Sequence, residues 1–281
     1  MDLSFQDISG TLRLIDADEL IPIIQKILPT WPFTIGSISS SEALITIKFS
    51  NGQYSRTSPW LEEPKIYYDP INAVCDFLVD LVHAFNTNKP EDMCLHCAAI
   101  SIDGKAVVFP NGYNQGKSTL IALLASRGIR VVCDDVLPFT GSEPNGLSLG
   151  IQPRLRNPIP ETFGKEFNHF ANNHIGPASD RFSYLNLSTT QLASFGEQFP
   201  IAAIVLIQRG DFEEETLLPA SKEEALKNII ERNFANNPSA INILDTLHSI
   251  IEEAPCYQLN WSNGKSVGKL LLNTFSSNHK A

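Results

Sequence analysis

The sequence predicts an α/β fold, and three segments carry this prediction. The apolar run 106–109 leads into a loop that ends in Gly-Lys-Ser-Thr, and helical spacing follows over residues 119–127. A second apolar run, 130–133, ends in two aspartates, and a third, 201–207, is apolar at every position. Continuous apolar runs are typical of strands that are covered on both faces. Such strands alternating with helices predict a layered α/β core.

The chain is expected to divide into an N-terminal α+β subdomain, residues 1–90, and a main domain, residues 91–281. Periodic apolar residues, turn residues and capping residues mark the elements of the first part. They are a helix over 16–28, a strand over 43–49 with an Asn-Gly hairpin turn at 51–52, a helix from the N-cap Asp69 to about residue 86, and a linker over 88–92. We expect this subdomain to dock the substrate, with a role as structural cover as the alternative.

The main domain is expected to combine a central sheet with C-terminal helices. Its elements are strands over 94–102 and 105–109 joined by an Asp103-Gly104 turn, the loop and helix described above, a strand over 130–133, a hairpin with Pro144-Asn145-Gly146 at its tip, a strand over 201–207, a capped helix over 222–234, a helix over 241–253 and a strand over 257–261. Ligands of open α/β sheets bind at the carboxyl ends of strands, so we expect the loop and the two aspartates to be neighbours.

The composition argues against several classes of partner. The 281 residues carry a formal net charge of −10 and no basic block, which predicts no nucleic-acid partner, because phosphate backbones need clusters of Lys and Arg. No apolar stretch reaches about 18 residues and the N-terminus lacks a secretory signal, which predicts no membrane partner. Five cysteines without regular spacing are typical of reduced thiols and predict a cytoplasmic protein.

Residues 110–120 read P-N-G-Y-N-Q-G-K-S-T-L, a pattern typical of loops that bind the phosphates of a nucleoside triphosphate. Backbone N–H groups of such a loop face the anion, Lys117 would add a mobile positive charge, and Ser118 can coordinate Mg²⁺. Asn111 stands where the usual pattern has a glycine, and asparagine tolerates left-handed backbone better than most residues. The predicted nucleotide-binding residues are Asn111, Gly112, Tyr113, Asn114, Gln115, Gly116, Lys117, Ser118 and Thr119. A surface turn is the alternative.

A second Gly-Lys-Ser triplet occurs at residues 264–266, after the apolar segment 257–261. The preceding Asn263 makes an Asn-Gly pair, which favours the turn of a β-hairpin. Leu259 stands where the first glycine of a phosphate loop would be. We therefore interpret this triplet as a chance match.

Asp134 and Asp135 end the predicted strand 130–133, and their side chains are expected to face opposite ways. Phosphoryl transfer to a hydroxyl needs a carboxylate that accepts the proton and acidic groups that hold Mg²⁺, and two aspartates can divide these tasks. The alternative is a hydrolase-like turn in which one aspartate touches metal. His96 either tunes an aspartate or phosphate, or is a buried histidine without a chemical role. A zinc site at His96 would need four ligands, and the sequence has no second Cys/His cluster to complete the set.

Residues 95–139 resemble the catalytic domain of HPr serine kinase/phosphorylase and of its diverged single-domain relatives. The matching pieces are Leu95-His96, Asp103-Gly104, Gly116-Lys117-Ser118-Thr119, Arg127-Gly128 and Asp134-Asp135-Val136. Further along the chain, the hairpin with Gln152-Pro153-Arg154 and the strand and helix from Ile201 to Phe234 also resemble the diverged relatives. The resemblance implies a P-loop kinase core of the HPr kinase/phosphoenolpyruvate carboxykinase-like type. Some diverged relatives phosphorylate ribosomal peptides, including lasso-peptide precursors, and full-length members form hexamers, which leaves a homo-oligomer among the expectations.

The resemblance also implies residue roles. Asp134 would accept the proton of a serine-type hydroxyl, His96 would support it, Asp135 with Ser118 would hold Mg²⁺, and Lys117 with the loop would hold the phosphates. Two features depart from the family. Its glutamate-bearing signature has no clear counterpart, since Glu143 and Glu161 lie in other contexts, and residues 1–90 do not resemble the regulatory domain.

The sequence therefore predicts an ATP- and Mg²⁺-dependent kinase that acts on a serine-type hydroxyl of a peptide or protein. Arg154 and Arg156 are candidates for clamping phosphate or substrate, because Arg matches phosphate oxygens in a fork, and exposed loop arginines are the alternative. Two other functions remain open. One is a kinase for a small hydroxylated metabolite, and the other is a nucleotide-binding regulator with slow hydrolysis.

Overall fold

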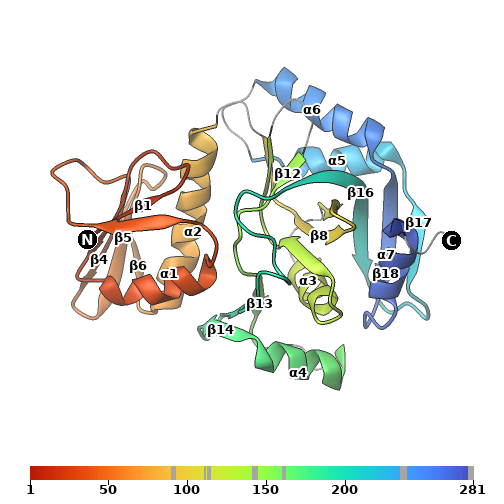
Figure 1. Cartoon of the computed structure of the whole chain (residues 1–281), viewed down its shortest axis with the longest axis horizontal. Coiled ribbons are helices and arrows are strands. Elements are labelled where there is room, and N and C mark those ends of the chain that lie inside the picture. Colours follow the sequence, from red (N-terminus) through yellow and green to blue (C-terminus); the bar gives the residue numbers. More distant parts are fainter. Residues whose placement is uncertain are drawn as a thin grey trace.

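The computed structural model describes residues 1–89, 93–110, 112, 115–140, 145–159, 163–234 and 239–277. It is a mixed α/β structure with three sheets, of which the two larger ones lie side by side in Figure 1. The N-terminal sheet has six strands in the order β3-β1-β2-β4-β5-β6. Its elements are β1 (Asp2–Phe5), β2 (Leu12–Ile15), the 3₁₀ helix η1 (Asp18–Leu20), α1 (Ile21–Ile27), β3 (Phe33–Gly36), β4 (Ile45–Ser50), β5 (Gln53–Thr57), β6 (Lys65–Tyr67) and α2 (Pro70–Thr87).

In the N-terminal part of the chain, turn and capping residues form the structures that the sequence predicts. Asn51 and Gly52 both have positive φ, 53° and 77°, and connect β4 to β5 as an antiparallel hairpin, as predicted. The Asp69 carboxylate accepts the Asn72 backbone N–H at 2.9 Å and caps α2. The described start of the predicted linker, residues 88–89, follows α2, and residues 90–92 lie outside the described part.

The N-terminal layer packs on the rest of the chain through α2, which stands between the two large sheets in Figure 1. The apolar core at this contact contains residues from both parts of the chain. Leu147, Leu149 and Tyr184 belong to the same buried cluster as Phe77 and Phe85 of α2. A division of the chain at residue 90 stays a prediction.

The main sheet contains nine strands. Seven follow the order β10-β8-β9-β16-β12-β11-β7, and β18 pairs with β16 and β17. They are β7 (Met93–Leu95), β8 (Ala98–Ile102), β9 (Lys105–Phe109), β10 (Arg130–Cys133), β11 (Leu137–Thr140), β12 (Asn145–Leu147), β16 (Gln198–Arg209), β17 (Thr216–Pro219) and β18 (Cys256–Trp261). The helices around it are α3 (Lys117–Ala125), α5 (Lys222–Arg232), α6 (Ala240–Glu253) and α7 (Val267–Phe275).

Strand directions bring four strand ends to one edge of this sheet. β9 and β10 are both antiparallel to the strand between them, β8, and are therefore parallel to each other. β16 is parallel to β9, and β18 is parallel to β16. The loop after β9, the aspartates after β10, Arg209 and Trp261 consequently lie along the same edge.

A small sheet of β13 (Arg154–Arg156), β15 (Phe182–Leu185) and β14 (Ile175–Ala178) completes the structure, together with α4 (Lys165–Asn173). These elements lie at the bottom of Figure 1. Strand β13 follows β12 in the chain and contacts α3, so it lies beside the edge that carries the loop.

Several expectations need correction. The predicted strand 94–102 is two strands in different places, because β7 pairs with β11 whereas β8 pairs with β9. Asn145 and Gly146 are paired residues of β12 and not the tip of its hairpin, whose connection, 141–144, lies outside the described residues. Residues 263–266 do not close a hairpin, since α7 follows them. α3 begins at Lys117, two residues before the predicted start, because Gly116 with φ 86° ends the loop there.

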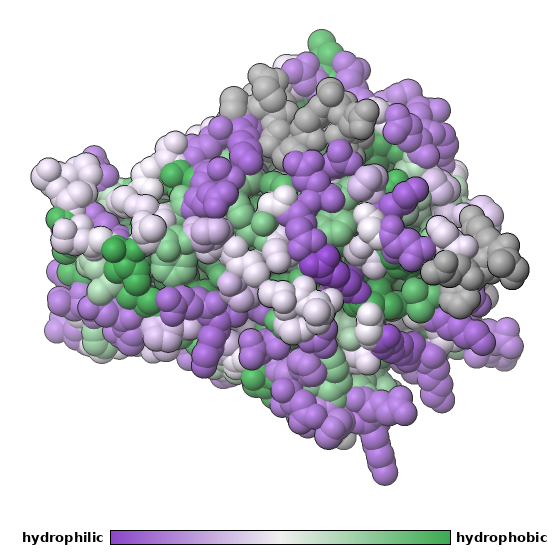
Figure 2. All heavy atoms as spheres, viewed as in Figure 1, coloured by the Kyte–Doolittle hydropathy of each residue, from purple (hydrophilic) through white to green (hydrophobic). Residues whose placement is uncertain are grey.

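The surface in Figure 2 is mostly hydrophilic, with small hydrophobic patches, one of which lies over the N-terminal layer on the left. Within the described part, no helix combines the length and apolar character that crossing a membrane requires. All five cysteines are buried and free of disulfide bonds.

Candidate functional site

Lys117 begins α3 directly after the loop, and its side chain turns back into the loop. The residue is only 8 % exposed. Its Nζ donates to the Gly112 carbonyl at 3.0 Å and lies 3.5 Å from Nε2 of His96. Burial lowers the pKa of Lys117, and the nearby Asp135 opposes this effect. The ammonium group therefore lies at the mouth of the helix N-terminus, where an anion would bind.

The other predicted loop residues fall into two groups. Gln115 is exposed, and Ser118 and Thr119 are half-buried in the first turn of α3. Asn111, Tyr113 and Asn114 lie outside the described residues, so their role in nucleotide binding stays a prediction.

His96 joins the lysine to the second aspartate. It lies in the short connection between β7 and β8. Its Nδ1 lies 3.1 Å from Oδ1 of Asp135. Burial lowers the pKa of His96 below 6.5 despite Asp135, and Lys117 lowers it further. A neutral imidazole with its proton on Nδ1 fits both contacts, because it donates to Asp135 and offers Nε2 to the ammonium of Lys117.

Asp134 is the buried member of the aspartate pair, with 8 % exposure. Its Oδ2 accepts the Arg154 backbone N–H at 3.0 Å, and its Oδ1 is buried without a hydrogen-bond partner among the described residues. Burial, and then the charge of Asp135, raise its pKa to about 6, although Arg154 and the Ser118 side chain lower it. This carboxylate can therefore gain and lose a proton near neutral pH.

Asp135 is the exposed member of the pair. Its side chain is 55 % exposed, and its Oδ2 lies 3.7 Å from Nη2 of Arg154. The two aspartates thus have different partners, the backbone of Arg154 for Asp134 and the side chains of His96 and Arg154 for Asp135.

Arg154 ties the N-terminal layer to this site. Its Nη1 donates to Sγ of Cys75 on α2, and its guanidinium lies over the Phe182 ring at 4.6 Å from the centroid. Burial lowers the pKa of Arg154. This effect is outweighed by the neighbouring Cys75, Tyr184 and the two aspartates, so the pKa lies above its usual value. The structure thus brings Arg154 to the predicted site. Arg156, two residues further along β13, is exposed.

The oxygen atoms gathered here fit Mg²⁺ bound together with a phosphate ligand. The exposed carboxylate of Asp135 and the hydroxyl of Ser118 are ligands of the kind that Mg²⁺ prefers, and the unpartnered Oδ1 of Asp134 is left to accept a proton. Among the described residues, no group of three or more His, Cys, Asp or Glu side chains could hold a metal ion by itself. Mg²⁺ usually takes one or two carboxylates and completes its shell with phosphate oxygens and water, which agrees with this set.

The second Gly-Lys-Ser segment also precedes a helix, α7, but an acidic side chain of the protein occupies its N-terminus. Glu215 already lies where an anion would bind, since its Oε2 accepts the Ser266 backbone N–H at 2.6 Å and the Ser266 hydroxyl at 2.7 Å. An added Cβ at Gly264 would lie 2.0 Å from Leu123 of α3, so the turn is packed against protein. The segment has no room for phosphate.

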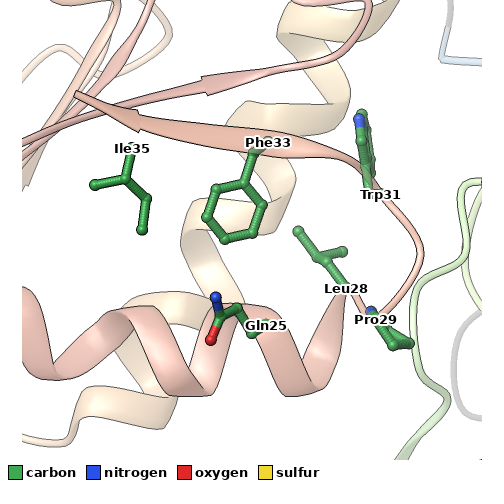
Figure 3. A pocket seen from close by; sticks show the side chains of 6 residues that line it. All are labelled: Gln25, Leu28, Pro29, Trp31, Phe33 and Ile35. Atoms are coloured by element: carbon green, nitrogen blue, oxygen red, sulfur yellow. The ribbon is translucent and has the colours of Figure 1, made fainter.

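One open hollow lies in the N-terminal layer, away from the residues of the candidate site. It has a volume of about 380 Å³. Figure 3 shows its lining side chains between α1 and β3: Gln25, Leu28, Pro29, Trp31, Phe33 and Ile35. The lining contains no ionisable side chain, so the hollow lacks the charges that phosphate chemistry requires.

Two functional candidates were missed from the sequence. Arg232, at the end of α5, lies against Gly112 of the loop, and Arg209, at the end of β16, lies against Gly116. Both are brought to the loop by long-range pairing of strands and helices. A basic residue at the last turn of a capped helix is the one local signal for Arg232, and it is a weak signal because such residues are common.

Comparisons with known proteins add a distant likeness. No family model and no curated protein matches the sequence. Among solved structures, the chain is similar to the HPr(Ser) kinase/phosphatase from Coxiella burnetii, with 16 % sequence identity, a TM-score of 0.34, and coverage of 64 % of this chain and 95 % of that one. Likeness at this level is a similarity of chain path, so the function has to be inferred from the side chains of the site.

Proposed function

We propose that the protein transfers the γ-phosphoryl group of ATP to a serine-type hydroxyl of a peptide or protein, with Mg²⁺ as cofactor. One observation supports this most directly. The buried ammonium of Lys117, at the junction of loop and helix, shares a single cluster with His96, Asp134 and Asp135. A cation that holds phosphate beside a carboxylate that takes a proton is the minimum that such a transfer requires.

The residues divide the reaction between them. The acceptor oxygen forms a bond to the γ-phosphorus, the bond from that phosphorus to the bridging oxygen of ADP breaks, and the hydroxyl proton passes to Asp134. The pKa of about 6 leaves Asp134 mostly ionised at neutral pH and basic enough to accept this proton. Lys117 and the N–H groups at the start of α3 hold the phosphates. Mg²⁺ held by Asp135, Ser118 and phosphate oxygens would neutralise charge on the transferring group.

The exposure of Asp135 and Arg154 favours a large acceptor over a small metabolite. The Asp135 side chain is 55 % exposed and that of Arg154 is 31 % exposed, so this side of the cluster opens to solvent. A serine on a peptide can reach such a site from outside. A metabolite kinase would use an enclosed pocket with converging polar groups.

The lysine of the loop provides the first test, and the second Gly-Lys-Ser segment supplies a matched control. We expect Lys117→Ala to weaken binding of Mg-ATP by at least about 10²-fold, because it removes a charged contact to phosphate from a partly buried site. Lys265→Ala removes the lysine of the control segment, where Glu215 already occupies the helix end, and should leave binding unchanged. Calorimetric titration of both variants measures this difference. Unchanged binding in Lys117→Ala would refute the nucleotide site.

The acceptor class is tested with γ-labelled ATP and a mixture of serine-containing peptides. Label on peptide supports the proposal. Label in a small-molecule fraction after addition of a metabolite extract would identify a metabolite kinase. Release of labelled phosphate alone would identify a regulator that hydrolyses ATP slowly, and either of these two results would overturn the peptide assignment.

A further inference from the structure

Arg232 lies against the phosphate loop, although it comes from the far end of α5. A Cβ added to Gly112 would lie 3.3 Å from Nη2 and 3.6 Å from Cζ of Arg232. The guanidinium therefore packs directly on the loop backbone, and the missing side chain of Gly112 leaves the space that it occupies. The Arg232 side chain is 20 % exposed, which leaves it partly open to a ligand in the loop.

Backbone hydrogen bonds fix the end of α5 beside His96. The His96 N–H donates to the Arg232 carbonyl at 2.8 Å, and the Phe234 N–H donates to the Cys94 carbonyl at 3.0 Å. An antiparallel bridge between Leu95 and Asn233 lies between these two bonds. The position of Arg232 is thus set by the same segment that positions His96.

The charge of Arg232 is poorly compensated by the protein. Its Nε is buried without a hydrogen-bond partner among the described residues. Glu231, its neighbour in the chain, lies 3.3 Å away, and the Glu231 side chain is 49 % exposed, so water weakens this ion pair. The positive charge also lowers the pKa of Lys117 and of His96. Two cations that flank Gly112 repel each other, and an anion bound between them would remove that cost.

We propose that Arg232 is a second phosphate-binding cation of the loop and that it contacts the terminal phosphoryl group together with Lys117. This inference rests on the function proposed above. The terminal group is the one that must lie beside Asp134, and Arg232 is linked to that part of the site through His96, which bonds to the Arg232 carbonyl and contacts both Lys117 and Asp135. The fork of an arginine matches the oxygens of a phosphoryl group and stabilises the charge that spreads over them during transfer.

The test compares a triphosphate with a diphosphate. Arg232→Gln keeps most of the side-chain volume and removes the charge, Arg232→Lys restores a charge, and Lys227→Ala removes an exposed charge from the same helix as a control. Calorimetry measures binding of Mg-ADP and of a Mg-bound non-hydrolysable ATP analogue, and transfer is measured at saturating labelled ATP. Thermal unfolding checks that each variant is folded.

We expect Arg232→Gln to weaken binding of the ATP analogue by about tenfold or more, to change ADP binding less than about twofold, and to slow transfer by about 10²–10³-fold. Arg232→Lys should recover part of the transfer rate, and Lys227→Ala should resemble the parent. Equal losses for ADP and the analogue would overturn the assignment to the terminal group, and unchanged binding and transfer would overturn any contact with phosphate. A parent protein that binds neither nucleotide would instead refute the proposed function itself.

Discussion

Replacing Asp134 with asparagine should stop transfer and at the same time make the protein more stable. The side chain is buried, and the aspartate Oδ1 has no hydrogen-bond partner among the described residues. Asparagine has nearly the same shape and carries no charge, and its carbonyl oxygen can still accept the Arg154 N–H that Oδ2 accepts now. The substitution therefore removes the cost of burying a carboxylate and keeps most contacts.

The size of this cost follows from the pKa. Burial and the charge of Asp135 move the pKa of Asp134 from 3.8 to about 6. Each pKa unit corresponds to about 1.4 kcal/mol, so the ionised form costs on the order of 3 kcal/mol of stability at pH 8. The folded protein keeps this proton up to a higher pH than the unfolded chain does. Its free energy of unfolding consequently falls as the pH rises from about 4 to about 6.

Urea denaturation of Asp134→Asn and of the parent protein at pH 8 and pH 4.5 measures the size and the sign of the change in the free energy of unfolding. We expect the variant to be more stable by about 1–3 kcal/mol at pH 8, and the difference to shrink towards pH 4.5, where the parent carboxyl is protonated. Asp180→Asn, at an exposed aspartate, controls for the substitution itself and should change little at either pH. Transfer should fall by about 10²–10⁴-fold in Asp134→Asn, with ATP binding retained.

Two results would refute this reasoning separately. A variant that is no more stable than the parent at pH 8 would mean that the buried charge is not costly, and the raised pKa would be wrong. A variant that retains normal transfer would mean that another group accepts the proton, whatever its stability.

Three further predictions concern pH and packing. Transfer by the parent protein should decline as the pH falls below about 6, where Asp134 becomes protonated, and a pH–rate profile at saturating ATP measures this. Asp80→Ala leaves the buried Arg56 charge without its partner at 2.8 Å, and urea denaturation should show a loss of about 3–5 kcal/mol. Gly264→Ala places a Cβ 2.0 Å from Leu123 at a φ of 75° and should cost more stability than Gly52→Ala, which meets open space at a φ of 77°.

The elements that the sequence predicts well are those specified by neighbouring residues. The helix α2 has its cap and apolar face within its own span, and α5 has Ser221, whose hydroxyl accepts the Glu224 N–H at 3.1 Å. By contrast, the N-cap residues of α4 and α7, Gly164 and Ser266, make no side-chain capping hydrogen bond. Their formation depends on what they pack against, which no window of sequence contains.

The same distinction applies to the site. The loop and the two aspartates are local motifs, so their positions follow from two strand ends that share a sheet edge. The partners that adjust their chemistry come from elsewhere in the chain. Cys75 of α2 holds the Arg154 side chain, and Arg232 of α5 reaches Gly112. These contacts form only when β13 and α5 have docked, and the sequence around the motif does not encode them.

The two Gly-Lys-Ser segments show why the environment of a motif decides its chemistry. Both follow strands that end at the same edge of the sheet, and both lead into a helix with a positive-φ glycine before the lysine. At residues 264–266 the chain itself supplies the anion, since Glu215 accepts two hydrogen bonds from Ser266. At residues 116–118 two cations lie at the loop, with Lys117 inside it and Arg232 against Gly112, beside the carboxylates of Asp134 and Asp135. A helix end whose backbone N–H group already donates to a carboxylate has no further use for phosphate, whereas one with two cations beside it gains stability when phosphate binds.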